Sequence, residues 1–350
     1  MPKVIEILSR RRIRPWAKTV LALLAGVLIY SGFWFYGAMQ VIGTAEQWIV
    51  ERRADGYRIQ YNDLRASGYP FAIRIKLNDV GFGDPNGAAP WAWQGQNLVI
   101  STRPWRLDRV HMQITGKQVF SYQKLNFRGS LNAADLDLVH DNGDPQSLTL
   151  TISGLDLAAG PGAGEKISLA SASINLRRLT GQGETLALDV TSAGIDMPSV
   201  MDWPLGRRIA DLRLAARLLG DLPRGAGAPL VEVLEIWRDG GGTVEIDRFV
   251  IDHGPLKLTT DGTLALDRNL QPVGAFTARI SGFFETIDAF SRQGIIGVRQ
   301  AIAAKLLLGV LARRPQGGGP SILNLAVTLQ GRDLYAGPVK LLRMPMVNWR

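Results

Sequence analysis

An uncharged, strongly apolar run near the N-terminus constrains this chain more than any other feature. Residues 19–45 contain no charged side chain, and the 18 residues before them carry six lysines or arginines. A helix needs roughly 20 apolar residues to cross a bilayer, so the run is long enough to span one. Because basic flanks favour the cytoplasmic side, the pattern predicts a cytoplasmic tail at 1–18 and a transmembrane signal anchor at 19–43.

A cleaved signal peptide is the main alternative for this segment. Gly43, Thr44 and Ala45 are small residues of the kind found at cleavage sites. The run is nevertheless much longer than a signal h-region of about 7–15 residues, and it contains the bulky aromatic series 34–36. The sequence therefore favours an uncleaved anchor, with everything after about residue 44 outside the cytoplasm.

Charge is divided unevenly along the 350 residues. Residues 1–44 carry six basic side chains and one acidic one, a net charge of +5, which leaves +4 for the rest of the chain. Because nucleic-acid binding needs a concentrated basic face, the near-balanced outer part argues against that role. The chain also has no cysteine, which excludes disulfides, thiolate metal sites and cysteine nucleophiles.

Beyond the anchor, apolar and polar residues alternate. In the segment 71–77 (FAIRIKL), four large apolar residues share one face, with two basic residues opposite. Such alternation is typical of half-buried strands in an antiparallel sheet. The same period of two recurs at 147–152, 186–190, 256–258, 264–266 and 323–329. Turn signals separate these runs, at 84–87, 141–143, 160–162, 239–242 and 253–255.

Helical patterns are few and short. A capping box at Thr44 and Gln47, with Gly56 as the C-cap, predicts a juxtamembrane helix at 44–56. This helix could also simply continue the membrane helix outward. Three further helices are predicted, at 229–238, 283–292 and 298–314.

The predicted fold is mainly β, with a large, mostly antiparallel sheet domain over 57–350 and a possible seam near 221–229. Each strand presents an apolar face that helices, a second sheet, a partner or a ligand must cover. The few short helices cannot cover a dozen or more strands. The sheet is therefore expected to form a curled groove, a sandwich or an open barrel, and these alternatives stay open.

Several motifs occur in a characteristic order. ADGY at 54–57, SGYPF at 67–71, WAW at 91–93 and RPW at 103–105 are followed by WRDGG at 237–241 and DGTLALD at 261–267. In this order they resemble an uncharacterised Gram-negative envelope family, domain-of-unknown-function family 2125, known from alphaproteobacteria. The resemblance implies an envelope protein of unknown activity, and it supplies no catalytic residue. Together with the anchor, it leads us to predict a bacterial inner-membrane protein with a periplasmic domain.

The hairpin pattern is similar, more distantly, to AsmA-type envelope proteins. That group is associated with long β-grooves and lipid handling, but a shared style of fold does not establish a shared function.

Candidate catalytic residues are sparse. His111, His140 and His253 lie far apart in sequence and form no hydrolase or metal motif. Asp135 and Asp137 alternate with apolar strand positions, which predicts a solvated sheet face. No catalytic, cofactor-binding or metal-binding residue is therefore predicted.

A glycine-rich segment at 159–166 superficially resembles a phosphate-binding loop. Glu165 precedes Lys166, and Ile167 stands where such a loop has serine or threonine. The segment is therefore expected to be a loop between strands.

Three segments are candidates for packing or docking. The SGYPF segment is expected to turn at Gly68 and Pro70 and to pack its aromatic rings, or alternatively to dock a partner. The helix at 298–314 is expected to cover a sheet face, or alternatively to lie on the membrane surface. Trp91, Trp93 and Trp105 are expected in loops.

The strongest functional argument is one of surface area. Exposed apolar patches larger than a few hundred Å² usually mark binding sites, and an acyl chain gains about 0.8 kcal/mol per methylene buried from water. The sequence therefore predicts a non-enzymatic, membrane-anchored periplasmic protein that binds or shields lipid-like molecules. A scaffold module that docks envelope proteins through Trp91, Trp93 and Trp105 is the alternative, and a hydrolase is a third, disfavoured class.

Overall fold

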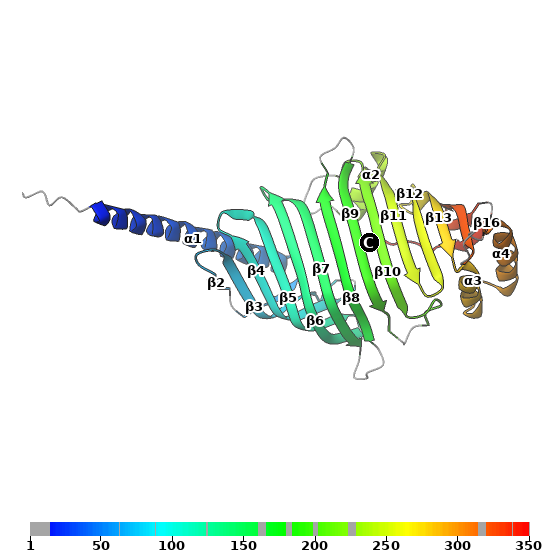
Figure 1. The fold of residues 1–350 in the computed structure, drawn as a ribbon, viewed down its shortest axis with the longest axis horizontal. Coiled ribbons are helices and arrows are strands. Elements are labelled where there is room, and N and C mark those ends of the chain that lie inside the picture. Colours follow the sequence, from blue (N-terminus) through cyan, green and yellow to red (C-terminus); the bar gives the residue numbers. More distant parts are fainter. Residues whose placement is uncertain are drawn as a thin grey trace, which may run out of the picture.

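The computed structural model describes residues 15–62, 64–87, 89–123, 125–159, 166–179, 184–198, 202–222, 229–313, 320–337 and 339–349. Within these ranges the chain forms one long helix, one large antiparallel sheet and three shorter helices (Figure 1). The basic tail before Pro15, most of the glycine-rich segment 159–166 and most of the predicted seam at 221–229 lie outside the described residues.

A single helix, α1 (Pro15–Ala54), contains both the predicted membrane segment and the predicted juxtamembrane helix. The expected capping box is wrong. The Thr44 hydroxyl donates to the Gln40 carbonyl (2.9 Å), and the Gln47 amide donates to the Glu51 carboxylate (2.9 Å), all within the helix. Because no breaker separates the two segments, the helical hydrogen bonds continue through them.

The helix ends where the sequence predicts. Gly56 has φ +94°. Its N–H donates to the Arg53 carbonyl (3.1 Å), and the Tyr57 N–H donates to the Arg52 carbonyl (3.0 Å). This pair of bonds is the Schellman arrangement, which satisfies carbonyls that a helix end leaves free and favours glycine at the left-handed position. The cap therefore ends α1 and turns the chain into the sheet.

The sheet has 16 strands within the described residues, and their order follows the chain, except that β2 pairs only with β3 (Figure 1). Neighbours run antiparallel and are joined mainly by short turns. Between β6 and β7, Asn142 and Gly143 have φ of +48° and +91°, as a type I′ hairpin requires. The strands are β1 (Arg58–Gln60), β2 (Ala66–Ser67), β3 (Ile73–Asp84), β4 (Trp91–Arg103), β5 (Arg106–Tyr122), β6 (Leu125–Asp141), β7 (Asp144–Ala159), β8 (Lys166–Arg178), β9 (Glu184–Asp196), β10 (Arg208–Leu219), β11 (Thr243–His253), β12 (Leu256–Leu266), β13 (Pro272–Ser281), β14 (Ile322–Gln330), β15 (Asp333–Ala336) and β16 (Val339–Arg343).

One face of the sheet is apolar from β3 to β14, because the strand register places apolar residues opposite one another. Strands lie about 4.8 Å apart, so this face is about 50 Å long. One row of direct partners runs Leu77, Leu98, Ile114, Ala134, Ile152, Ala172, Ser192, Leu212, Ile251, Leu258, Ile280 and Leu323. The adjacent row runs Ile75, Ile100, Met112, Leu136, Leu150, Ile174, Val190, Leu214, Phe249, Thr260, Ala278 and Leu325.

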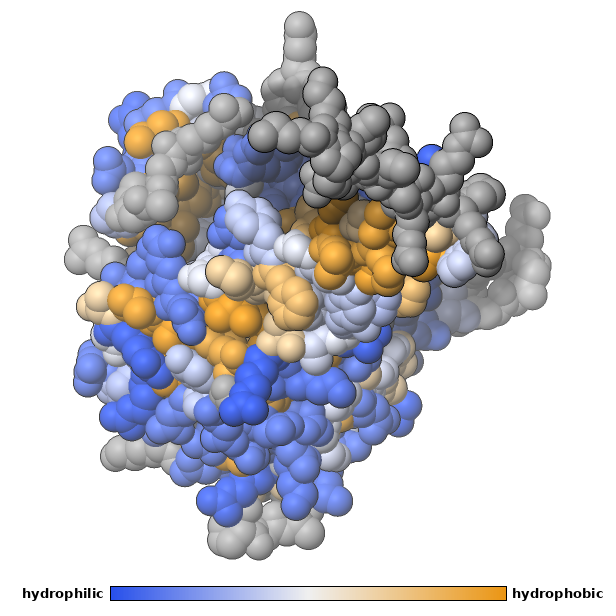
Figure 2. Space-filling view, turned by 90° about the vertical axis from the view of Figure 1, so that its left-hand side faces the viewer, coloured by the Kyte–Doolittle hydropathy of each residue, from blue (hydrophilic) through white to orange (hydrophobic). Residues whose placement is uncertain are grey.

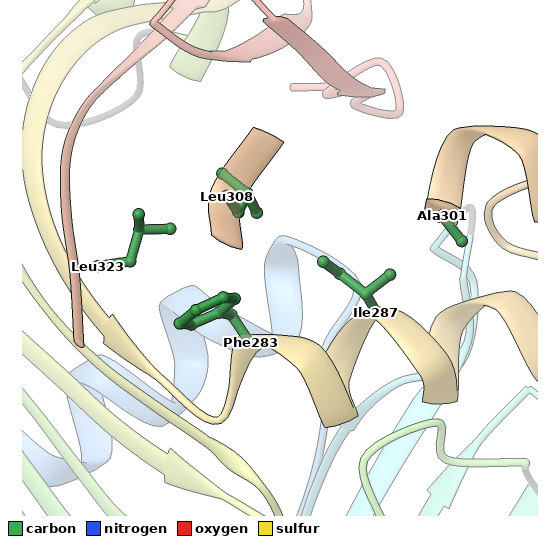
Figure 3. Packing of buried hydrophobic residues seen from close by; sticks show 5 residues of the cluster. All are labelled: Phe283, Ile287, Ala301, Leu308 and Leu323. Atoms are coloured by element: carbon green, nitrogen blue, oxygen red, sulfur yellow. The ribbon is translucent and has the colours of Figure 1, made fainter. Parts of the chain in front are cut away.

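Helices cover this face at its two ends. At the first strand, Trp34 and Ala38 of α1 bury Ile73. At the other end, α3 (Phe283–Arg292) and α4 (Val298–Leu311) close over Leu323. Figure 3 shows Phe283 of α3 and Leu308 of α4 beside that leucine, with Ile287 and Ala301 farther along the same cluster. Because Ile73 and Leu323 belong to the same face by register, the helices cap opposite ends of one surface.

A third cover lies beside β10 to β13. Trp237 of α2 (Leu230–Asp239) is buried, and its indole N–H donates to the Leu219 carbonyl (2.8 Å). Near the C-terminus, the Trp349 indole donates to the Leu270 carbonyl (2.7 Å). These two tryptophans pack in one cluster with Leu270, so the C-terminal segment is fastened to the sheet.

The structure decides between the predicted forms of the sheet. All described strands belong to one open, curled sheet (Figure 1), so the curled form is confirmed and the sandwich is wrong. A sandwich would need a second sheet, and every described strand belongs to this one. The predicted helices at 229–238 and 283–292 are confirmed, and the third extends over Val298–Leu311.

Gly282 provides a test of the cover at the far end. It precedes α3 at φ +70°, and a Cβ there would lie 1.7 Å from the Pro255 carbonyl oxygen. We expect Gly282→Ala to destabilise the protein by at least ~3 kcal/mol, because a left-handed alanine and a backbone clash both cost free energy. The measurement is the urea midpoint followed by circular dichroism.

Gly294 is the matched control for this substitution. It has nearly the same φ (+71°), but a Cβ there meets nothing within 4 Å. We expect Gly294→Ala to cost only ~1 kcal/mol. Equal losses for the two variants would contradict the packing of α3 against the β11–β12 turn.

Candidate functional site

Among the described residues, no cluster of buried residues covers the apolar face over β5 to β9. Within the described chain, the clusters of fully buried residues centre on α1 with β3, on α2, and on α3 with α4. The residues of the two rows on β5 to β9 are mostly only half-buried. We infer that the curled sheet shields these side chains partly with its own neighbours. The half-buried members are Met112, Ile114, Leu136, Leu150, Ile152, Ala172, Ile174, Val190 and Ser192.

The opposite face of the same strands is polar. His111 Nδ1 lies 2.9 Å from the Asp137 carboxylate, and the Gln113 amide donates to the Asp135 carboxylate (2.8 Å). These side chains alternate with the apolar row residues, as expected from the period of two. The structure therefore places Asp135, Asp137 and His111 together on the solvated face of the sheet.

An arginine–aspartate pair joins two strands of this polar face. Arg217 of β10 donates to both carboxylate oxygens of Asp247 of β11, with Nη2 2.7 Å from Oδ1 and Nε 3.0 Å from Oδ2. The hydrogen bonds from Arg217 lower the pKa of Asp247, and partial burial opposes this shift. The pair therefore links β10, which ends before the predicted seam, to β11, which begins after it.

Two of the three candidate docking tryptophans are not in loops. Trp91 and Trp93 lie within β4, which continues the strand pairing to the end of β3, so that prediction is wrong. The Trp93 indole donates to Gln118 Oε1 (2.9 Å), and Gln118 is only 4% exposed. Trp105 alone lies in a turn, between β4 and β5, and is exposed.

The SGYPF segment packs against the anchor helix. Gly68 turns the chain at φ +98°, and Tyr69–Pro70 is a cis peptide. The Tyr69 hydroxyl lies 2.8 Å from Ser31 Oγ, and its ring meets the Trp34 ring edge-to-face at 5.6 Å. The predicted packing is therefore confirmed for Tyr69.

The same prediction is wrong for the second aromatic ring, because Phe71 is 73% exposed. Phe71 lies two residues before Ile73, where β3 begins, so the sheet does not bury its side chain. The loop therefore presents a large apolar ring beside α1 without a protein partner to bury it.

A groove of about 650 Å³, here called the anchor groove, lies between α1 and this loop. Its helix wall consists of residues between Thr19 and Tyr30, and its other wall consists of Tyr69, Pro70 and Phe71. Figure 2 views the end of the molecule from which α1 emerges, and shows apolar residues gathered in a band across its middle and hydrophilic residues over its lower part. The anchor groove and the sheet face are thus two apolar surfaces of one molecule.

A family model described as "Uncharacterized protein conserved in bacteria (DUF2125)" matches residues 34–345. The chain belongs to this family. The match covers most of the chain, including the SGYPF loop and the whole sheet. No curated protein and no solved structure matches.

The histidines of this DUF2125 protein are dispersed. His111 lies between Asp135 and Asp137, His140 Nε2 is 3.0 Å from the Leu107 carbonyl, and His253 Nε2 is 2.7 Å from the Gly206 carbonyl. In the part of the chain that the structure describes, no group of three histidine, aspartate or glutamate side chains could hold a metal ion. The structure thus brings His111 together with Asp135 and Asp137, whereas His140 and His253 each contact a backbone carbonyl elsewhere.

Sequence reasoning missed the contact between the SGYPF loop and the anchor. Three polar or amphipathic residues inside the apolar run, Tyr30, Ser31 and Trp34, were the available signal. All three form hydrogen bonds to the loop or to Ala72 beside it. A hydroxyl or an indole N–H within a membrane helix needs such a partner.

The Arg217–Asp247 pair predicts a pH dependence of stability. Because the folded-state pKa of Asp247 is lowered, its contribution is present above the usual aspartate pKa of about 4 and is lost as pH falls through the folded value. Both side chains are more than a third exposed, so solvent screening keeps the contribution below ~1 kcal/mol. Asp247→Asn should therefore lower stability slightly at pH 7.

The control is Asp189→Asn, because Asp189 meets Arg177 by a single contact of 3.5 Å on the same face. Urea midpoints of the two variants and the parent chain at pH 7 and pH 3 provide the measurement. A loss for Asp247→Asn that stays the same at both pH values would contradict the assigned pKa shift.

Proposed function

We propose that α1 anchors this protein in the bacterial inner membrane, and that the apolar face of its periplasmic sheet binds the acyl chains of lipid-like molecules. The observation that carries the proposal is the long, mainly apolar surface from β3 to β14, which is interrupted only by Ser192 and Thr260 in the two rows, covered at its ends and half-buried over β5 to β9. Large exposed apolar patches usually mark binding sites, which supports the proposal.

The proposed anchor rests on the length and exposure of α1. Its apolar part is long enough to cross a bilayer, and only 11% of its most apolar 18-residue segment is buried. A core helix of a soluble protein would be mostly buried. The basic residues in 1–18 support an N-terminus on the cytoplasmic side, because positively charged flanks remain there.

The proposed role is to hold or pass on a lipid without chemistry. An acyl chain that moves from a bilayer to the sheet face leaves one apolar environment for another, so it gains little of the about 0.8 kcal/mol per methylene that transfer from water would give. Binding that nearly balances the membrane suits a protein that both takes up and releases lipid. A catalytic role has no support from the histidines, none of which bonds to a hydroxyl nucleophile among the described residues.

Charge on the middle of the face should remove bound lipid. Leu150 lies on the apolar face of the central strand β7, and Leu150→Glu would place a carboxylate among acyl chains. We expect a several-fold loss of lipid per protein, because an unpaired charge in an apolar site is costly. The measurement is lipid extraction and quantification from the full chain purified in mild detergent.

Thr151→Glu is the matched control, because Thr151 is the next residue in β7 and lies exposed on the opposite face. Its lipid content should equal that of the parent chain. Equal lipid content in both variants would contradict the proposed site. The full chain is required, because α1 supplies the cover of Ile73 and Ile75.

A protein-docking role is the second candidate, and the exposed side of α4 favours it. One side of α4 covers the sheet, as predicted, through the buried residues Ala301 and Leu308. On the same helix, Ile302, Leu306 and Val310 are exposed. If α4 docks a partner protein, replacing Ile302 and Val310 by glutamate should abolish protein crosslinks in cells and leave lipid content unchanged. Crosslinks that persist in this variant would remove the support for docking through α4.

A further inference from the structure

We propose that an acyl chain of a membrane phospholipid occupies the anchor groove, and that the Tyr69–Phe71 loop is inserted in the bilayer. This inference rests on the proposed anchor, but it does not require lipid on the sheet face. It assigns a lipid site to residues between Thr19 and Tyr30 of α1, where the sheet does not reach.

The depth of the groove follows from where α1 becomes buried by protein. From Pro15 to Phe33 the helix rises about 27 Å, close to the ~30 Å of a bilayer hydrocarbon core. From Trp34 onward one side of the helix packs against the protein, because Trp34 and Ala38 are both 4% exposed. The groove lines the helix before that point, so its wall lies within the hydrocarbon layer.

At this depth, three carbonyls of the loop and its neighbour Ala72 accept hydrogen bonds from protein groups. Irregular backbone within a membrane is tolerated only where protein supplies its hydrogen bonds. The Pro70 carbonyl accepts from the Tyr30 hydroxyl, the Ala72 carbonyl accepts from the Trp34 indole (2.9 Å), and the Gly68 carbonyl accepts from the Ala72 N–H (3.0 Å). Pro70 has no N–H to satisfy. The helix therefore supplies hydrogen-bond donors to two of these carbonyls, in place of water.

The chemistry of the groove selects a hydrocarbon occupant. Its two phenol groups are already paired, Tyr30 with the Pro70 carbonyl and Tyr69 with Ser31. Most of the remaining lining consists of aliphatic carbon, together with the exposed ring of Phe71. Its volume of about 650 Å³ lies within the range of sites that bind small ligands. An acyl chain of the surrounding leaflet is the ligand that this position and lining fit.

Single cysteines can test the depth of the loop, because the chain contains none. Nitroxide labels would be placed at Phe71→Cys in the loop, at Leu24→Cys in α1 and at Val298→Cys in α4, all of which are exposed sites. The full-length protein is reconstituted in nanodiscs of phosphatidylethanolamine and phosphatidylglycerol. Collision with oxygen reports hydrocarbon, and collision with a nickel chelate reports water.

We expect the labels at residues 71 and 24 to report hydrocarbon and the label at 298 to report water. A label at 71 that reports water, while the label at 24 reports hydrocarbon, would overturn the loop insertion and leave the anchor intact. Labels at both positions that report water would overturn the anchor itself, and with it the proposed function.

Two glycines of α1 test whether the groove holds the chain. A Cβ at Gly26 or at Gly32 meets nothing within 4 Å, but only Gly26 lines the groove. With phospholipid that carries a photoreactive acyl chain, we expect Gly26→Leu to reduce crosslinks to the 66–72 segment several-fold. Gly32→Leu should leave them unchanged. Equal crosslinking in the two variants would show that the groove does not hold the chain.

Discussion

Cross-strand pairing of apolar residues is the interaction on which the rest of this structure depends. Each strand contributes one or two large side chains to rows that run perpendicular to the strands, and direct cross-strand pairing joins the members of each row despite register shifts elsewhere in several pairs. A one-residue slip in any strand would move its apolar set to the polar face. The main role of the turns and bulges is therefore to keep the apolar side chains of each strand on the same face of the sheet.

The anchor helix has two environments along its length. Its first part is exposed on all sides except at the anchor groove, whereas Trp34, Ala38 and Ile49 are buried by the sheet or its neighbouring segments. One helix thus provides both the proposed membrane span and the cover of the first strand. The proposed membrane span therefore leads directly to one end of the apolar face, and α3 and α4 cover the opposite end (Figure 1).

Much of the fold follows from local sequence. The period of two, the Asn142–Gly143 turn and the Gly56 cap depend on neighbouring residues, and the structure confirms them. The openness of the sheet could not be predicted, because it depends on which distant strands fail to pair. The packing of Tyr69 on α1 and the place of Trp93 within β4 likewise join segments more than 20 residues apart. The sequence predicted an apolar sheet surface but not its shape. The strand register in the structure shows which residues form this surface.

Native mass spectrometry of the full-length protein, released from mild detergent, tests the central claim most directly. The account predicts mass additions that survive gentle activation and fragment as lipids, because the sheet face and the anchor groove both suit acyl chains. A polypeptide that appears only at its bare mass, under conditions that preserve lipid on a known lipid-binding membrane protein, would contradict it.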